Sequence, residues 1–105
     1  MLLDESIDWR VGRELVPHEV KTARQMGWTT LKNGELLALV SVQFDAFVTV
    51  DRNLSFQQDI VSFPIAVVVL RARTNRLADL RPLVPSLISA MESTRPGTVT
   101  FVSQS

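Results

Sequence analysis

The sequence of 105 residues contains no cysteine and a single histidine, His18. Without cysteine there can be no disulfide, thiolate zinc site, iron–sulfur cluster or cysteine nucleophile. One histidine excludes a multi-histidine metal site, and no G-x-S-x-G elbow accompanies it. Neither of the familiar glycine-rich phosphate loops is present. Carboxylates are therefore the side chains that offer the most chemistry.

Long apolar runs are also missing. The longest extends from Ile65 to Leu70, far short of the roughly 20 residues that a membrane helix needs. Residues 1–5 lack both the basic start and the long apolar stretch of a signal peptide. Hydrophobic residues at 46% and charged residues at 21% are ordinary for a globular domain. We expect a cytoplasmic protein with no membrane contact, folded as one domain over residues 1–105.

Positive and negative charges balance over the whole chain but not along it. Residues 1–51 hold eight acidic and five basic side chains, whereas residues 71–105 hold five arginines and two acids. A formal net charge of zero disfavours a globally basic nucleic-acid binder. The asymmetry is compatible with an acidic metal site beside an anion-binding surface, although solvated charged faces are the simpler explanation.

Alternating strand and helix patterns predict an α/β fold with a mostly parallel sheet. Strands are expected at 1–4, 18–22 and 46–50, and the unbroken apolar run at 65–70 is typical of a central strand covered on both faces. A last strand is expected at 98–102, at an edge where it could pair in a homodimer.

Helices are expected between these strands. The four-residue spacing of Ile7, Val11 and Leu15 indicates one helix face, for which Ser6 is a candidate N-cap. Residues 23–32 read as a short helix or loop broken at Gly27, and residues 53–60 as a helical turn. Further helices are predicted after two candidate caps, Asn33 and Asn75, and the prolines at 82 and 85 predict a break near Arg81.

Three acidic residues stand where predicted elements meet one edge of the sheet. Asp4 follows the first strand, Asp51 follows the strand at 46–50, and Glu35 lies in the first turn of the helix before that strand. The carboxyl ends of parallel strands share one rim, where sites form. Two carboxylates ~4 Å apart repel by about 4 kcal/mol at an effective dielectric near 20, so convergence favours a bound Mg²⁺ or Mn²⁺. Each acid also has a structural explanation, as a turn residue, a partner of a helix dipole or a turn cap.

The segments that carry these acids resemble a known family. Leu2-Leu3-Asp4-Glu5, the stretch from Asn33 to Leu39, and the stretch from Val48 to Asn53 are similar to those of the short PIN-like domains, relatives of the VapC-type toxin nucleases. The resemblance implies a three-layer α/β/α fold. It also implies a Mg²⁺- or Mn²⁺-dependent endoribonuclease, either the toxin of a toxin–antitoxin pair or an RNA-processing enzyme. RNA and an antitoxin protein are the partners that it implies.

The resemblance assigns roles to individual residues. It implies that Asp4, Glu35 and Asp51 bind the metal and carry catalysis. Asn53 stands where the family usually has a further aspartate, and its carbonyl oxygen is a candidate additional ligand. The residues expected to support the site or position the substrate are Glu5, Thr49 and Arg52.

The phosphate-binding residues are predicted from position alone. Arg71, Arg73 and Arg76 follow the strand at 65–70, whose end should lie at the same rim, and the forked guanidinium suits RNA phosphates. Exposed arginines after a strand would look the same. Trp9 and Trp28 are candidates to stack on bases, although each is more often a packing residue, and Trp28 is expected to be the more exposed.

Two other functions remain open from the sequence. The neutral Asn53 motivates a catalytically degenerate PIN-like module that binds a partner protein. A DNA-acting nuclease or a general phosphoesterase is the third interpretation, because the same acidic chemistry does not name its polymer.

Overall fold

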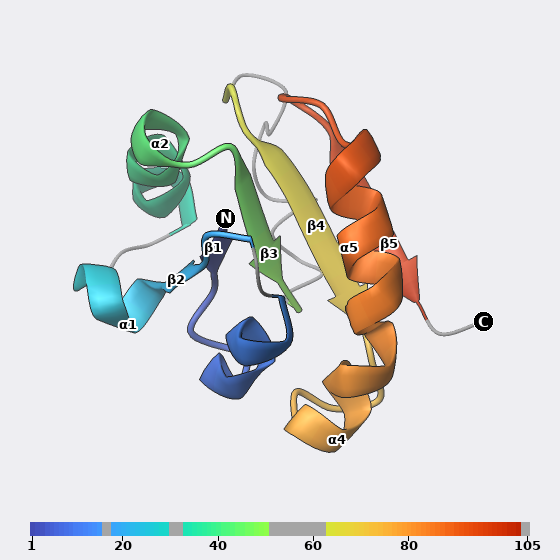
Figure 1. The fold of residues 1–105 in the computed structure, drawn as a ribbon. Coiled ribbons are helices and arrows are strands. Elements are labelled where there is room, and N and C mark those ends of the chain that lie inside the picture. Colours follow the sequence, from blue (N-terminus) through green and yellow to red (C-terminus); the bar gives the residue numbers. More distant parts are fainter. Residues whose placement is uncertain (16–17, 30–32, 51–62, 104–105) are drawn as a thin grey trace.

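In the part of the chain that the structure describes, a five-stranded parallel sheet forms the middle layer (Figure 1). The computed structural model describes residues 1–15, 18–29, 33–50 and 63–103. The strands are β1 (Leu2–Leu3), β2 (Lys21–Thr22), β3 (Ala46–Thr49), β4 (Ala66–Arg71) and β5 (Val99–Ser103). Their order is β2-β1-β3-β4-β5, and every neighbouring pair is parallel. All of these strands therefore end at one edge of the sheet, which we call the carboxyl edge.

Helices cover both faces of the sheet. The helical segments are the 3-10 helix η1 (Trp9–Leu15), α1 (Ala23–Met26), α2 (Asn33–Gln43), α4 (Leu77–Leu80), the 3-10 turn η3 (Arg81–Leu83) and α5 (Val84–Ser93). Within the described residues, η1, α4, η3 and α5 pack on one face and α2 packs on the other. This arrangement confirms the predicted three-layer α/β/α fold. No helix among the described segments is long and apolar enough to cross a membrane.

Side chains alternate along each strand, so the sheet supplies two separate apolar cores. Leu3 and Val48 pack toward η1 and α5, whereas Leu2 and Phe47 pack toward α2. β4 lies between β3 and β5 and contributes to both cores. Its unbroken apolar sequence follows from this position, because both sets of its side chains are buried.

The first helix differs from its prediction at its start. Ser6 does not cap it, because the helix begins only at Trp9; the Ser6 hydroxyl donates to Asp4. Asp8 stands directly before η1, and its carboxylate accepts the backbone N–H of Arg10 at 3.0 Å. η1 buries Val11 as the four-residue spacing predicted, but it is wound as a 3-10 helix.

A glycine allows η1 to pack closely on the sheet. A Cβ at Gly12 would lie 3.3 Å from Val20 Cγ1 and 3.7 Å from Leu3 Cδ1. The first of these contacts would be tighter than ordinary van der Waals contact. Gly12 lowers the helix propensity of η1, but it allows η1 to pack closely against Val20, directly before β2.

α1 has a strong local start and stop. The Thr22 side chain accepts the backbone N–H of Gln25 at 3.1 Å, and the Gln25 side chain accepts that of Thr22 at 2.9 Å, which is a capping box. Gly27 ends the helix with φ 74°, a left-handed conformation that glycine adopts without strain. The predicted break at Gly27 is confirmed.

The helices after β4 confirm the predicted break near Arg81, which η3 supplies around Pro82. Asn75 is not the cap that the sequence predicted. The backbone N–H of Arg76 instead donates to the Thr74 hydroxyl at 3.0 Å. The helical turn predicted at residues 53–60 lies outside the described residues.

Candidate functional site

Asp4 is the first residue after β1 and lies at the carboxyl edge. Its backbone N–H donates to the carbonyl of Val48 at 2.9 Å, which extends the pairing of β1 with β3. The Asp4 Oδ2 atom accepts hydrogen bonds from the hydroxyls of Thr49 and Ser6, both at 2.8 Å. Oδ1 accepts the backbone N–H of Glu5 at 2.9 Å. Three donors from β3 and from the turn after β1 thus fix the carboxylate.

Thr49 is the one buried polar side chain in the part of the chain that the structure describes, with an exposed fraction of 0%. It ends a strand whose preceding residues, Ala46 to Val48, are all apolar and buried. Burial of a hydroxyl destabilises a fold unless the hydroxyl finds a hydrogen-bond partner, and here it bonds to Asp4. The buried Thr49 hydroxyl therefore supports the Asp4 carboxylate from the neighbouring strand.

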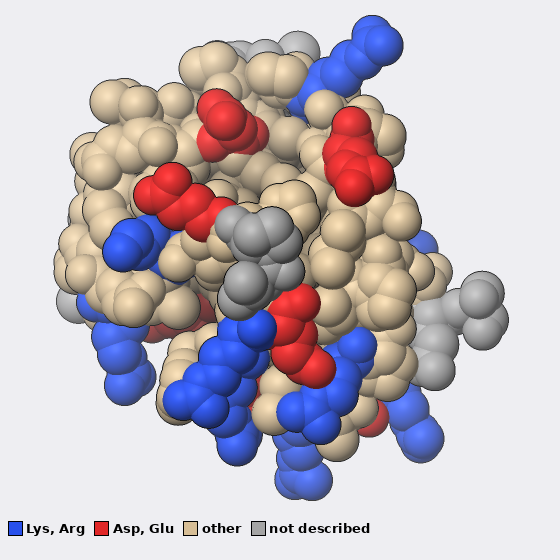
Figure 2. All heavy atoms as spheres, viewed as in Figure 1, with Lys and Arg blue, Asp and Glu red and all other residues tan. Residues whose placement is uncertain are grey.

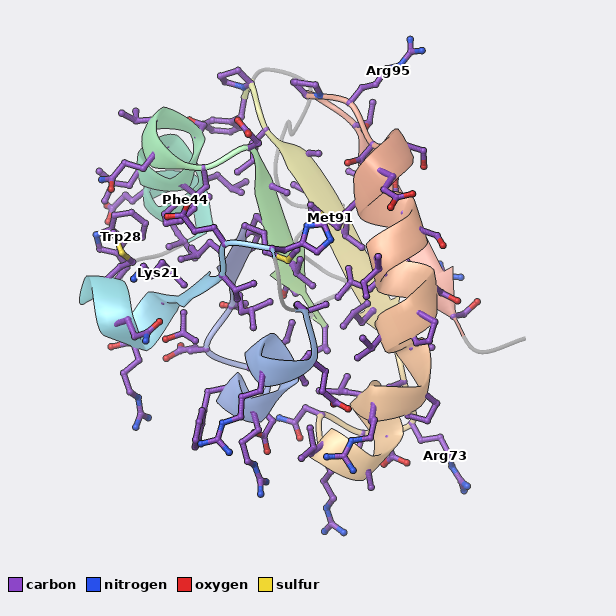
Figure 3. All side chains as sticks on the ribbon, viewed as in Figure 1. Lys21, Trp28, Phe44, Arg73, Met91 and Arg95 are labelled. Atoms are coloured by element: carbon purple, nitrogen blue, oxygen red, sulfur yellow. The ribbon has the colours of Figure 1, made fainter. Side chains whose placement is uncertain are left out.

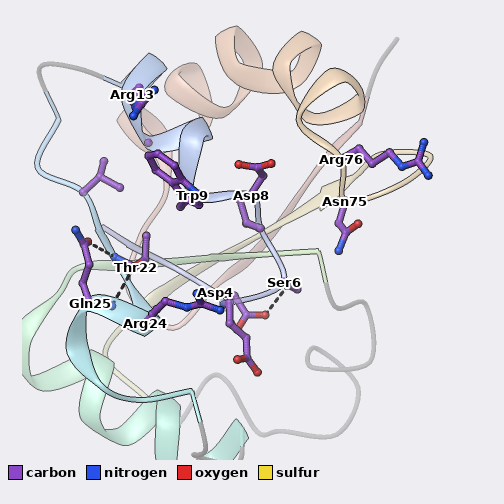
Figure 4. A pocket seen from close by; sticks show the side chains of 14 residues that line it. Asp4, Ser6, Asp8, Trp9, Arg13, Thr22, Arg24, Gln25, Asn75 and Arg76 are labelled. Atoms are coloured by element: carbon purple, nitrogen blue, oxygen red, sulfur yellow. Dashed lines mark hydrogen bonds between the residues drawn. The ribbon is translucent and has the colours of Figure 1, made fainter.

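A pocket of about 870 Å³ opens beside Asp4 (Figure 4). Residues from Asp4 to Arg13 form one wall, residues from Val20 to Gln25 form a second, and Asn75 and Arg76 close a third side. These segments all follow or flank the carboxyl ends of β1, β2 and β4. Sites of open parallel sheets form at this edge, so the pocket occupies the expected place.

Charges of both signs line this pocket. The acidic side chains are Asp4, Glu5 and Asp8, and the guanidinium groups are those of Arg13, Arg24 and Arg76. Figure 2 shows basic side chains gathered at the lower end of this view, around η1 and α4, with acidic side chains among them. The site therefore combines groups that attract a cation with groups that attract phosphate.

One of the three acids is already paired. Asp8 accepts two side-chain hydrogen bonds from Arg10, at 3.0 and 2.7 Å. These bonds, with the backbone N–H of Arg10, lower the pKa of the Asp8 carboxyl to about 2. Asp8 is thus ionised at neutral pH and paired with Arg10, whereas Asp4 and Glu5 form no salt bridge among the described residues.

Glu35 lies in the first turn of α2 and is exposed. Because α2 leads into β3 from the amino edge, its first turn is the end nearer to the carboxyl edge (Figure 1). No three His, Asp or Glu side chains in the described ranges stand close enough together to hold a metal ion. Asp51, Arg52 and Asn53 lie outside those ranges.

The three predicted phosphate-binding arginines separate in space. Arg76 lines the pocket with Asp4. The Arg71 guanidinium lies over the ring of Phe101, 4.2 Å from its centroid. Arg73 is exposed and projects away from the body of the protein (Figure 3). The structure therefore brings one of the three to the candidate site.

The two tryptophans are exposed in the opposite order to the prediction. Trp28 is partly buried against the α2 core and meets Phe44 edge-on, with ring centroids 6.3 Å apart (Figure 3). The turn at Gly27 explains the burial of Trp28, because it folds the chain back along α1. The backbone N–H of Trp28 then donates to the carbonyl of Ala23. Trp9 is 57% exposed and lines the pocket.

Sequence reasoning missed Arg13 and Arg24 as pocket residues. The sequence around each arginine holds a feature that could have indicated its position. Arg13 follows Trp9 by four residues, on a helix whose Val11 and Leu15 are buried. Arg24 lies inside the capping box that begins at Thr22, which fixes α1 directly after β2.

The arrangement has a defined chemical capacity. A fixed carboxylate provides oxygen ligands of the kind that Mg²⁺ and Mn²⁺ prefer, and nearby guanidinium groups bind phosphate oxygens. No family model matches this chain, no curated protein is significantly similar to it, and no solved structure matches it significantly.

Proposed function

We propose that the protein is a divalent-metal-dependent ribonuclease of the PIN-like type and that Asp4 anchors its metal site. The observation that carries this proposal is the Asp4 carboxylate, held by two hydroxyls and one backbone N–H beside a pocket with three arginines. A carboxylate that is fixed before a ligand arrives loses little conformational freedom on binding it. The resemblance of residues 2–5, 33–39 and 48–53 to PIN-like domains supports the same assignment.

In this proposal Asp4, Glu35 and Asp51 share one or two Mg²⁺ or Mn²⁺ ions. Glu5 and Thr49 support the Asp4 carboxylate, and Arg52 and Asn53 follow Asp51 in the same segment. When bound, the ion supplies an activated water and neutralises charge that develops on the scissile phosphate. The contribution of the described residues is to place one rigid carboxylate at the carboxyl edge and to surround it with cationic groups.

The substrate class follows from the charges of the pocket. Arg24 and Arg76 line different sides of the pocket, and Arg76 extends outward from its rim (Figure 4), so a chain of phosphates that enters the pocket passes cationic groups on both sides. Guanidinium groups bind phosphate through two parallel hydrogen bonds. A polyanion such as RNA fits this distribution better than a small uncharged substrate does.

Thermal melts with and without Mn²⁺ test the metal site. At ten times its dissociation constant, a ligand adds about 1.4 kcal/mol to the native state, which raises the Tm of a domain of this size by about 6–11 °C. We expect this shift in the wild-type protein and its loss in Asp4→Asn and Asp51→Asn. Asp45→Asn is the matched control, because Asp45 is an exposed carboxylate at the amino end of β3.

Cleavage of a labelled single-stranded RNA in Mn²⁺ completes the test. We expect cleavage by the wild-type protein and by Asp45→Asn, and a loss of at least about 100-fold in Asp51→Asn, because a metal site acts as a unit. The proposal is wrong if Asp51→Asn leaves both the Mn²⁺ shift and the cleavage unchanged.

A second candidate function is a PIN-like module that binds a partner protein, such as an antitoxin, without nuclease activity. The exposed apolar residues of α2 favour it, since Val42 is 80% and Leu39 is 40% exposed. An apolar helix surface is typical of interaction sites. This function is favoured over the nuclease if Mn²⁺ does not change the Tm of the wild-type protein and if Val42→Asp loses binding to the partner protein.

A further inference from the structure

Trp9 is an exposed aromatic residue that lines the pocket. It stands at the first position of η1 and keeps 57% of its surface in solvent. Burial of apolar surface is favourable by about 25 cal/mol per Å², so a ligand that covers a large exposed aromatic ring gains binding free energy. The ring lies within the same pocket as the Asp4 carboxylate (Figure 4).

The Arg13 side chain lies against the indole of Trp9. Its guanidinium carbon lies over the ring of Trp9, 4.4 Å from the centroid, which is cation–π distance. The guanidinium covers one face of the ring, and the exposed fraction shows that much of the remaining surface stays open. A ring backed by a guanidinium on one face can stack a ligand's ring on its open surface.

The groups around Trp9 match the parts of a nucleotide. Arg24 and Arg76 provide cationic groups on two different walls, and Asn75 provides an amide that can donate to and accept from a base edge. The pocket of about 870 Å³ has the size of sites that enclose small organic ligands. A flat aromatic platform beside cations is the combination that binds unpaired bases with their phosphates.

We propose that this pocket is a subsite for single-stranded RNA, in which one unpaired base stacks on Trp9 while the flanking phosphates contact Arg24 and Arg76. The inference rests on the proposed action on RNA and adds to it the reason for single-strand selectivity. In a duplex both faces of an internal base are already stacked on its neighbours, so the base cannot lie on Trp9 unless it leaves the stack. Asp4 lines the same pocket, so a strand whose base stacks on Trp9 also passes the proposed metal site.

Trp28 allows a clean optical measurement of this stacking. Trp28 lies outside the lining of the pocket, against Phe44. A Trp28→Phe protein therefore reports fluorescence from Trp9 alone. We expect an unlabelled oligouridylate to quench this fluorescence in buffer with EDTA, where no divalent cation is available and no cleavage occurs.

Affinity measurements identify the residue responsible. In the same buffer, fluorescence anisotropy of a labelled oligouridylate should show a loss of about 5–150-fold in Trp9→Ala, which is the range for one lost base–aromatic stack. Trp9→Phe should recover most of the affinity, whereas Trp28→Phe should bind as the wild-type protein does. Circular dichroism melts of Trp9→Ala check that the fold is kept, which the exposure of this side chain predicts.

Each outcome separates the inference from the proposed function. Binding with Trp9 quenching, but no cleavage in Mn²⁺, supports the base subsite and refutes the nuclease. Cleavage in Mn²⁺ with equal RNA affinity for Trp9→Ala and the wild-type protein refutes the subsite and keeps the nuclease. A duplex of the same length that binds as tightly as the single strand, or the absence of any RNA binding, overturns the inference.

Discussion

The hydrogen bond from Thr49 to Asp4 allows a quantitative prediction about the site. Thr49→Val keeps the shape of the buried side chain and removes the hydroxyl that donates to Asp4 Oδ2 at 2.8 Å. Hydrogen bonds to charged groups contribute about 1.5–3 kcal/mol, and because Asp4 is only partly buried we expect the lower end, about 1.5–2 kcal/mol. The Ser6 hydroxyl still donates to the same oxygen, so the carboxylate keeps a partner in the variant.

A double-mutant cycle measures this term alone. Urea unfolding of the wild-type protein, Thr49→Val, Asp4→Ala and the double variant gives the coupling free energy of the pair, and other contacts of Thr49 cancel. Thr49→Ser is the control: it loses a buried methyl group, at about 0.8 kcal/mol, but keeps its coupling to Asp4. A coupling below about 0.5 kcal/mol, the usual deviation between independent sites, would refute the idea that Thr49 holds the carboxylate.

Three further predictions concern stability and titration. The Arg10 side chain lowers the pKa of Asp8 from 3.8 to about 2. The pair therefore stabilises the folded state above pH 3.8, and this stabilisation is lost as the pH falls toward 2. NMR titration of the Asp8 carboxyl should place its midpoint near 2, and Arg10→Gln should return the midpoint toward 3.8. Gly27→Ala should destabilise the protein by about 1–2 kcal/mol in urea unfolding, because φ is 74° and no atom lies within 4 Å of the added Cβ, so only backbone strain acts. Phe47→Ala should cost about 3–5 kcal/mol because the ring is fully buried, whereas Val42→Ser, at 80% exposure, should stay within about 0.5 kcal/mol of the wild-type protein.

The architecture could be predicted because its signals are local. The apolar run at 65–70 marked β4, the spacing of Val11 and Leu15 marked the buried side of η1, and Gly27 marked the end of α1. Each of these signals depends on periodicity or on backbone conformation at one position. Such features act within a few residues and do not require knowledge of the tertiary structure.

The order of the strands carried no such signal. β1 and β2 have two residues each, so their apolar content cannot specify which strand they pair with. The order β2-β1-β3-β4-β5 depends on contacts between residues far apart in the sequence. The predicted cap at Ser6 is wrong for a local reason, because η1 begins at Trp9 and the Ser6 hydroxyl donates to Asp4.

The candidate site could be predicted in part. Asp4 and Thr49 meet because parallel strands bring sequence-distant ends to one edge, which the sequence pattern allowed. The exposure of Trp9 and the approach of Arg24 depend on how η1 and α1 pack above β1 and β2, which periodicity does not encode. Asp51 and Glu35 stay predictions, as does the metal that they are proposed to share.

The separation of the pocket walls along the chain has a consequence for protein synthesis. The Asp4–Thr49 hydrogen bond joins residues 45 positions apart, and the wall that holds Arg76 comes later still. Because every neighbouring strand pair is parallel, no hairpin can form early and hold Asp4 in place. A nascent chain therefore has no assembled pocket until about three-quarters of it has left the ribosome.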